Sequence, residues 1–279
     1  MIQPFLKDDA FLQYVLMARQ ELDKLHLWWL GQSGFLIQWQ GHHLLIDPYL
    51  SDSLTKKYSG TAKPHVRMTE RVIAPDRLDF IEVVTSSHNH TDHLDGETLV
   101  PLLRVNPEIK VIVSHANVGF AADRIQVSPE RLTSIRVGSA PLTVGSFNFY
   151  AIPSAHEELE KDEQGDYKFI GLVLEVGGRV IYHSGDGLHY DGLVTYLKRW
   201  KIDLAVLPIN GRDPLRGVPG NFDSRSASLL GREIGAELVV PCHYEMFEFN
   251  TVPPQSFAKE AQKVGQEYYL LKCGERLDL

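Results

Sequence analysis

The feature that most constrains this chain is a run of metal-binding residue types at positions 86–94, which reads Ser-Ser-His-Asn-His-Thr-Asp-His-Leu. It follows an apolar, strand-like segment and precedes a helical stretch near Leu94–Arg104. A loop can turn such side chains inward around one point, and imidazole together with carboxylate suits zinc, manganese or iron better than calcium or magnesium. A solvated polar loop is the alternative, but three histidines crowded beside a carboxylate gain little without a metal. We therefore predict a metal site. Its ligands in this loop are His88, His90, Asp92 and His93.

Composition limits the remaining possibilities. The formal charge of −8 over 279 residues, without a cluster of Lys or Arg, argues against a nucleic-acid partner. The chain lacks an apolar run of about 18 residues, so we expect no membrane span. Its first residues include acids where a signal peptide would be basic, and Cys242 and Cys273 alone do not make a disulfide framework. We expect a cytoplasmic globular protein that acts on a small, anionic molecule.

The pattern along the chain predicts one domain, 1–279, of class α/β. Residues 1–26 form an N-terminal helical extension, with apolar side chains at helical spacing. Strand-like runs then alternate with short turns, and the last third alternates strands with helices, so we expect mixed sheets with helices packed outside. The predicted strands are Leu27–Leu30, Phe35–Trp39, Leu44–Ile46, Phe80–Thr85, Val111–Val113, Leu142–Ile152, Ile170–Val176, Val180–His183, Leu204–Pro208, Leu238–Pro241 and Tyr268–Leu271. The later predicted helices are Tyr190–Lys201, Ser224–Gly235 and Pro254–Val264.

Three further candidate ligands follow predicted strands. His156 comes after an apolar segment that ends near Pro153, while Asp186 and His243 follow the segments that end at His183 and Cys242. Taken singly, each is an ordinary polar loop residue. Their shared placement favours convergence with the histidine loop, because strands of neighbouring sheets end on a common edge.

These residues carry a family resemblance. His88-x-His90-x-Asp92-His93, followed by His156, Asp186 and His243 in that order, resembles the metallo-β-lactamase superfamily from about residue 27 to the C-terminus. The resemblance implies an αββα four-layer sandwich of two mixed β-sheets, with the metal site on one edge. It also implies one metal at His88, His90 and His156, a second at Asp92, His93 and His243, and Asp186 bridging the two.

Shorter motifs resemble the L-ascorbate-6-phosphate lactonase-like branch. That resemblance implies one or two manganese or zinc ions and hydrolysis of a sugar-acid lactone. The chain is shorter than those lactonases, which leaves the substrate and any homo-oligomer open. The motifs are Trp29–Phe35, Leu45–Tyr49, Leu207–Asp213, Gly220–Phe222 and Pro241–Phe247.

The chemistry of such a site predicts a reaction. A divalent metal lowers the pKa of bound water from 15.7 to about 7 and polarises a carbonyl or phosphoryl oxygen. We hypothesise that metal-bound hydroxide attacks an ester-like bond and that Asp92 is catalytic, orienting the hydroxide or taking up its proton. The substrate class is a lactone of a sugar acid or its phosphate. Two alternatives stay open: a phosphodiesterase of the same fold, and a metal-binding protein without catalysis.

Other residues are candidates near the site. Asp47 either supports a ligand imidazole by a hydrogen bond or forms a turn before Pro48. Asn210 and Arg212 follow a strand as the ligands do, and Arg212 either grips a substrate carboxylate or phosphate or is a surface arginine. Tyr244 either contacts the substrate or packs in the core. The segment Ser51–Arg77 is a candidate to cover the site.

Overall fold

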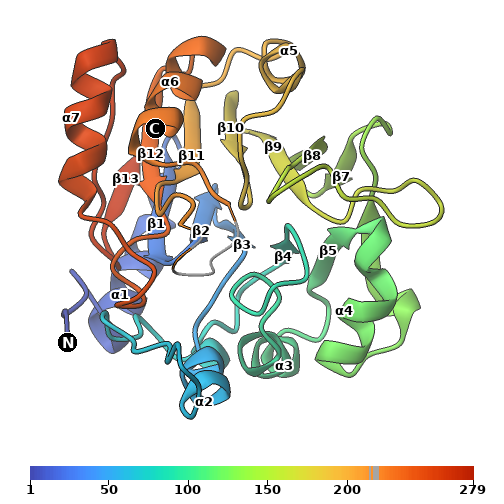
Figure 1. Ribbon diagram of the computed structural model, residues 1–279. Coiled ribbons are helices and arrows are strands. Elements are labelled where there is room, and N and C mark those ends of the chain that lie inside the picture. Colours follow the sequence, from blue (N-terminus) through green and yellow to red (C-terminus); the bar gives the residue numbers. More distant parts are fainter. Residues whose placement is uncertain (214, 216–219) are drawn as a thin grey trace.

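The computed structural model describes residues 1–213, 215 and 220–279. Figure 1 shows two sheets with helices on either side of the pair. In spatial order, the described strands of the first sheet are β13 (Arg276–Asp278), β1 (Leu25–Gly31), β2 (Gly34–Trp39), β3 (His42–Ile46), β4 (Val83–Ser86), β5 (Lys110–Ser114) and β6 (Leu132–Ile135). β1, β2 and β3 pair antiparallel through short turns, whereas β4, β5 and β6 continue parallel to β3.

The second sheet has the same mixed character. Its described strands are, in spatial order, β12 (Leu238–Cys242), β11 (Leu204–Pro208), β10 (Arg179–His183), β9 (Ile170–Val176), β8 (Phe147–Pro153) and β7 (Leu142–Val144). Strands β7 to β10 pair antiparallel and β10 to β12 pair parallel. Gly177 (φ 59°) and Gly178 (φ 74°) join β9 to β10, in the positive-φ conformation that a two-residue hairpin turn requires.

Helices cover both sheets. The described α-helices are α1 (Asp8–Ala18), α2 (Ser53–Tyr58), α3 (Gly96–Val105), α4 (Val118–Ile125), α5 (Leu193–Leu197), α6 (Ser224–Ile234) and α7 (Pro254–Val264). Single 3-10 turns lie at Pro75–Arg77, His115–Asn117 and Pro129–Arg131. α4 contacts β5 and β6, whereas α6 contacts β11, β12 and α7. Two mixed sheets flanked by helices confirm the predicted fold class.

Local sequence explains where the later helices begin and end. Asp223 caps α6, because its carboxylate accepts from the backbone N–H of Ser226 at 2.7 Å. Gly235 and Gly265 follow α6 and α7 in left-handed backbone, which glycine adopts at little cost. α7 has the bounds that the sequence predicted.

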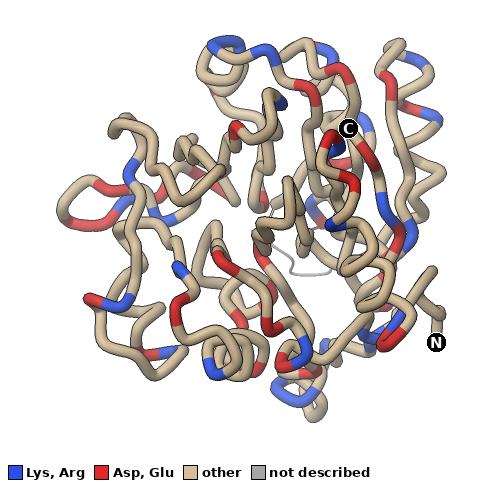
Figure 2. The backbone as a smooth tube through the Cα atoms, turned by 180° about the vertical axis from the view of Figure 1, so that it is seen from behind, with Lys and Arg blue, Asp and Glu red and all other residues tan. Residues whose placement is uncertain are grey.

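The N-terminal helix packs on the first sheet. Phe11, Val15 and Ala18 are buried, and the ring of Tyr14 meets that of Trp28 edge-on at 6.3 Å. None of the helices in the described part of the chain combines the length and apolar character needed to span a membrane. Figure 2 shows acidic and basic residues interspersed along the outer loops and helices.

Two strand predictions were wrong in their bounds. Tyr268–Leu271 makes only an isolated bridge, between Tyr268 and Val239 of β12, and the sequence did not predict β13, which forms an edge of the first sheet. β13 escapes a search for apolar runs because Arg276 and Asp278 flank its single apolar residue. Leu142–Ile152 is two strands, since the chain turns at Gly145, where φ is 55°.

The topology brings six strand ends to one edge. Gln32, Asp47 and residues 88–93 follow β1, β3 and β4 of the first sheet. His156, Asp186 and His243 follow β8, β10 and β12 of the second. The sheets are joined nearby, where the rings of Phe35 on β2 and His183 on β10 lie 6.0 Å apart.

Candidate metal centre

The loop after β4 is folded tightly enough to present several side chains to one point. The backbone N–H of Leu94 donates to the carbonyl of His90 at 2.8 Å. Arg124, on α4, donates through Nη1 to the carbonyls of Asn89 at 2.6 Å and Leu94 at 3.3 Å. The loop at positions 88–93 is thus held by its own backbone hydrogen bond and by the hydrogen bonds from Arg124.

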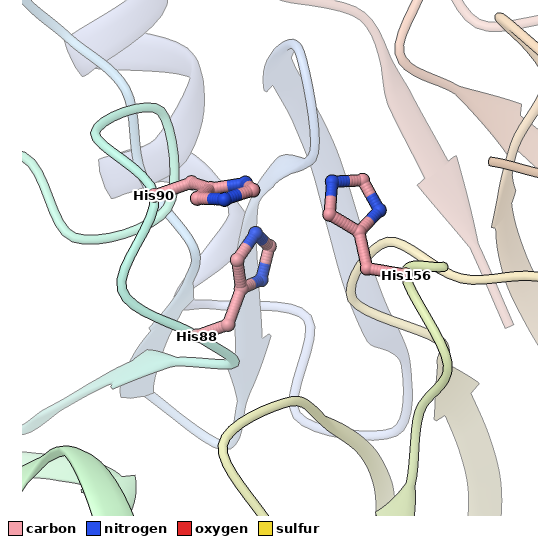
Figure 3. A group of neighbouring side chains, drawn as sticks. All are labelled: His88, His90 and His156. Carbon is pink, nitrogen blue, oxygen red and sulfur yellow. The ribbon is translucent and has the colours of Figure 1, made fainter. Parts of the chain in front are cut away.

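His88, His90 and His156 form a first ligand group. Figure 3 shows His88 and His90 approaching from the loop after β4 and His156 from the opposite side, and one nitrogen of each lies within 4.8 Å of the others. Nδ1 of His156 lies 2.8 Å from the carbonyl of Gly220, and Nδ1 of His88 lies 2.9 Å from Oγ of Ser87. These contacts leave the Nε2 atoms for a ligand. Burial lowers the pKa of His88 and of His90, which favours the neutral imidazole that binds a metal.

Asp92, His93 and His243 form a second group beside it. Asp186 lies between the two groups: its Oδ2 is 3.3 Å from Nε2 of His93, 3.6 Å from Nε2 of His243 and 4.0 Å from Nε2 of His156. The structure therefore brings all seven predicted ligands together, in two neighbouring groups with Asp186 between them.

The second group is strongly coupled electrostatically. Burial by itself lowers the pKa of His93, but the carboxylates of Asp186 and Asp92 outweigh burial and raise this pKa well above its usual value. Burial likewise opposes ionisation of Asp186, yet the neighbouring His93 and His243 hold the pKa of its carboxyl well below its usual value. The pKa of Asp92 is also lowered, against burial, chiefly by His93. These pKa shifts favour ionised carboxylates on Asp92 and Asp186 beside a positively charged His93.

Asp47 lies directly behind the second group. Its carboxylate accepts from the backbone N–H of Ser87 at 2.9 Å and from the Ser87 hydroxyl, and Oδ2 lies 2.6 Å from Nδ1 of His93. Asp47 is completely buried. It orients the His93 ring so that Nε2 faces Asp186, as a supporting carboxylate of a ligand histidine does.

The unpaired atoms of the site fit a divalent cation. Nε2 of His88 and Oδ1 of Asp186 are buried and have no hydrogen-bond partner among the described residues. Buried polar atoms are otherwise almost always paired. Imidazole nitrogens and carboxylate oxygens together suit zinc, manganese or iron, so these residues fit the metals that the sequence predicted.

The ligand groups open into a pocket of about 570 Å³, within the size range of small-molecule sites. It is lined by five of the seven candidate ligands and by residues from α2, the following segment, α4 and the loops after β11 and β12. The described lining residues are Gln32, Leu54, Lys57, Tyr58, Lys63, His65, Asn89, His90, Thr91, Asp92, Phe120, Arg124, His156, Asp186, Asn221, His243, Phe247, Phe249 and Asn250. The segment Ser51–Arg77 thus forms part of one wall.

Two predicted substrate contacts are placed elsewhere. Tyr244 packs in the core, which is the second of the two roles that the sequence left open: its buried hydroxyl donates to the carbonyl of Leu271, and its ring packs 4.4 Å from that of Trp29. Arg212 is not among the described lining residues, and its guanidinium lies 2.6 Å from the carboxylate of Glu157. Arg212 thus agrees with the second role that the sequence left open for it, a surface arginine, here paired with an acid.

Asn210 lies one layer behind the pocket. Its Nδ2 donates to Oδ1 of Asn250 at 3.0 Å, and its Oδ1 accepts from Nδ2 of Asn221 at 2.9 Å. Asn221 and Asn250 line the pocket, whereas Asn210 is not part of the described lining. Asn210 therefore positions two pocket amides instead of facing the pocket itself.

The sequence did not single out Gln32. It follows β1 as the ligands follow their strands, and its Nε2 lies 2.7 Å from Oδ2 of Asp92 and 2.9 Å from Nε2 of His243. Gln32, Asp47 and His243 all have positive φ, at 51°, 43° and 63°. This conformation is uncommon for such residues and often marks functional positions.

Comparisons with known proteins find similar chains and similar folds over most of the sequence. The chain is 25% identical over 258 residues to a UPF0173 metal-dependent hydrolase of Saccharolobus solfataricus, covering 90% of this chain and 98% of that protein. The metallo-beta-lactamase fold protein YhfI of Bacillus subtilis superposes with a TM-score of 0.66 at 19% identity, covering 92% of this chain and all of that one. An isothiocyanate hydrolase from Delia radicum gut bacteria superposes with a TM-score of 0.69 at 21% identity, covering 90% and 98%.

The fold and the grouped ligands define a protein of the metallo-β-lactamase fold with a candidate metal centre at the edge of its paired sheets. Residues 26–243 match the family model described as Beta-lactamase superfamily domain, and the chain belongs to this family.

Proposed function

We propose that this protein is a metal-dependent hydrolase of a lactone of a sugar acid or its phosphate, with zinc or manganese as its metal. The observation that carries the proposal is the pair of ligand groups sharing Asp186 at the base of an open pocket. A structural metal site saturates its ligands and is closed, whereas a catalytic one needs room for water and substrate. Relatives described as metal-dependent hydrolases add support.

His88, His90 and His156 would hold one ion and Asp92, His93 and His243 a second, with Asp186 shared. A bound divalent ion lowers the pKa of water to about 7 and polarises the carbonyl under attack. Asp92 lines the pocket, and its lowered pKa keeps it ionised. It accepts a hydrogen bond from the attacking water and so aims its lone pair at the substrate carbonyl.

The pocket walls suit an anionic substrate with hydroxyl groups. Lys57 and Arg124 line it as cations, and the amides of Asn221 and Asn250 supply neutral donors and acceptors. Tyr58 and Phe247 provide apolar surface. A sugar-acid lactone that carries a phosphate matches this combination, because its anion can pair with a cation while its hydroxyls meet the amides.

The test is a substrate panel with metal analysis. Purified protein loaded with zinc or manganese is assayed on sugar-acid lactones with and without phosphate, on phosphodiesters and on thioesters. We expect turnover of lactones, faster with the phosphorylated ones, and loss of activity after chelation. Preference for phosphodiesters would replace the proposed substrate class. No turnover of any substrate by protein that holds metal tightly would indicate a binding protein.

A further inference from the structure

Gln32 is fixed at the site by its backbone. It forms the tight turn between β1 and β2, is 1% exposed and has a φ of 51°. Its carbonyl accepts from the indole N–H of Trp29 at 2.9 Å and from the backbone N–H of His243 at 3.0 Å. The turn is thereby joined to a predicted ligand, so the Gln32 side chain emerges at a defined place.

The side-chain amide of Gln32 meets two members of the second ligand group. The same Nε2 lies 2.7 Å from Oδ2 of Asp92 and 2.9 Å from Nε2 of His243, and these two ligand atoms are 3.6 Å apart. An amide nitrogen donates hydrogen and has no lone pair for a metal. It therefore competes with a cation for Oδ2 of Asp92 and for the Nε2 lone pair of His243.

The first ligand group is held differently. The hydrogen bonds that anchor His88 and His156 engage their Nδ1 atoms, and Nε2 of His88 has no partner within the described structure. Those contacts prepare the imidazoles for a metal and do not compete with it.

We propose that Gln32 makes the two metal sites unequal: its amide competes for Asp92 and His243, so the site at His88, His90 and His156 fills first and the second binds metal more weakly. The inference rests on the proposed function only in requiring that the chain binds metal; it does not depend on the substrate. Gln32 is thus a positioning residue that sets metal occupancy.

If Gln32 were itself a metal ligand, its removal would weaken metal binding at the second group instead of strengthening it. Its Oε1 is buried and has no hydrogen-bond partner in the residues that the structure covers, so a reversed amide would point oxygen at the second group. Oxygen would then act as an added ligand and strengthen metal binding there. Removal of the side chain separates the two roles by the direction of the change.

The experiment measures bound zinc by elemental analysis after equilibrium dialysis against buffered free Zn²⁺. For the natural chain we expect two steps, the first at lower free zinc. Gln32→Ala should move the second step about tenfold lower in free zinc, since a hydrogen bond to a charged partner is of that strength. The first step should stay in place. Gln40→Ala is the matched control, because Gln40 is an exposed glutamine with the same φ of 51° that is not among the described pocket-lining residues, and it should change neither step.

A second variant, Gln32→Asn, controls for the possibility that Gln32→Ala misfolds. Gln32→Asn keeps a residue that tolerates left-handed backbone and withdraws the amide by one methylene, so it should shift the second step in the same direction. A second step that weakens or stays unchanged in correctly folded variants overturns the inference, as do two equal steps in the natural chain. Absence of bound metal from every variant and from the natural chain, after dialysis against zinc and against manganese, would overturn the proposed function as well.

Discussion

Oδ2 of Asp47 lies 2.6 Å from Nδ1 of His93, and both side chains are completely buried. The two residues follow different strands, β3 and β4, which pair in parallel so that both loops leave the sheet at the same edge. The carboxylate fixes the ring orientation and favours the tautomer that presents the Nε2 lone pair to a metal.

Removing the charge of Asp47 should weaken metal binding. In Asp47→Asn the amide replaces a carboxylate oxygen at His93, and we expect the second-site affinity to fall about 10- to 100-fold. Dialysis against buffered zinc measures this change. An unaltered second step in a folded variant would show that Asp47 has no supporting role.

Asp92→Asn should abolish most activity and preserve the fold. The side chain keeps its size, but it loses the ionised oxygen that orients the attacking water, so kcat should fall roughly 100- to 10,000-fold. The assay uses the best lactone of the substrate panel, with circular dichroism as the fold control. Full activity would remove Asp92 from the mechanism.

Gly185→Ala should destabilise the fold and displace Asp186. Gly185 has a φ of +66°, and an added Cβ would lie 2.9 Å from the carbonyl oxygen of Ile170 and from Cβ of Ser87. We expect a loss of about 2–4 kcal/mol in the free energy of unfolding. Gly178→Ala is the control: φ is +74° but its Cβ would meet no described atom within 4 Å, so only the backbone cost of about 1 kcal/mol applies. Urea unfolding measures both, and equal losses would contradict the steric argument.

His43 should make the fold sensitive to acid. Burial, with a smaller contribution from Arg19, lowers its pKa from 6.5 to about 3. Between these values the unfolded chain binds a proton that the folded chain does not, so stability falls as pH decreases from about 6.5. At pH 5 the loss from this group is about 2 kcal/mol. His43→Leu should remove that part of the slope in urea unfolding at pH 7.5 and pH 5, while His42→Gln, at the exposed neighbour, should not. Equal slopes in all three proteins would exclude His43.

Lys57→Gln should impair binding of the substrate anion. Lys57 lines the pocket, whereas the adjacent Lys56 is not among the described lining residues and pairs with Glu97 at 2.6 Å. We expect Lys57→Gln to raise KM for a phosphorylated lactone about three- to tenfold with little change in kcat. Lys56→Gln should leave both constants unchanged. Equal effects of the two substitutions would indicate general electrostatics and no direct contact.

Much of the fold was readable from sequence. Apolar runs closed by turn residues predicted most strands, and α7 was predicted with its observed bounds because proline precedes it and glycine follows it. β13 was missed because an edge strand needs few apolar residues. α2 was missed because its six residues carry too little periodicity within an irregular segment.

The grouping of the candidate metal ligands could be predicted from the sequence because each of these residues belongs to a motif or follows a strand. The pocket walls were not, because they depend on how segments far apart in sequence meet. Lys57 and Arg124 reach one pocket from α2 and α4, and no spacing rule connects them. The sequence could not decide between the two roles of Tyr244, because adjacency to His243 along the chain does not determine which side a tyrosine faces after a residue in left-handed backbone.

The candidate ligands are divided between the two sheets: residues 88–93 extend from the first sheet, and His156, Asp186 and His243 from the second. The complete set therefore cannot exist in half of the molecule, and it forms only after contacts between segments more than 150 positions apart in the chain have been made. Such distant contacts form late in folding. Metal uptake should consequently report completed folding, and a chain cut between β6 and β7 should lose its metal when the halves separate, because the cut parts residues 88–93 from His156, Asp186 and His243.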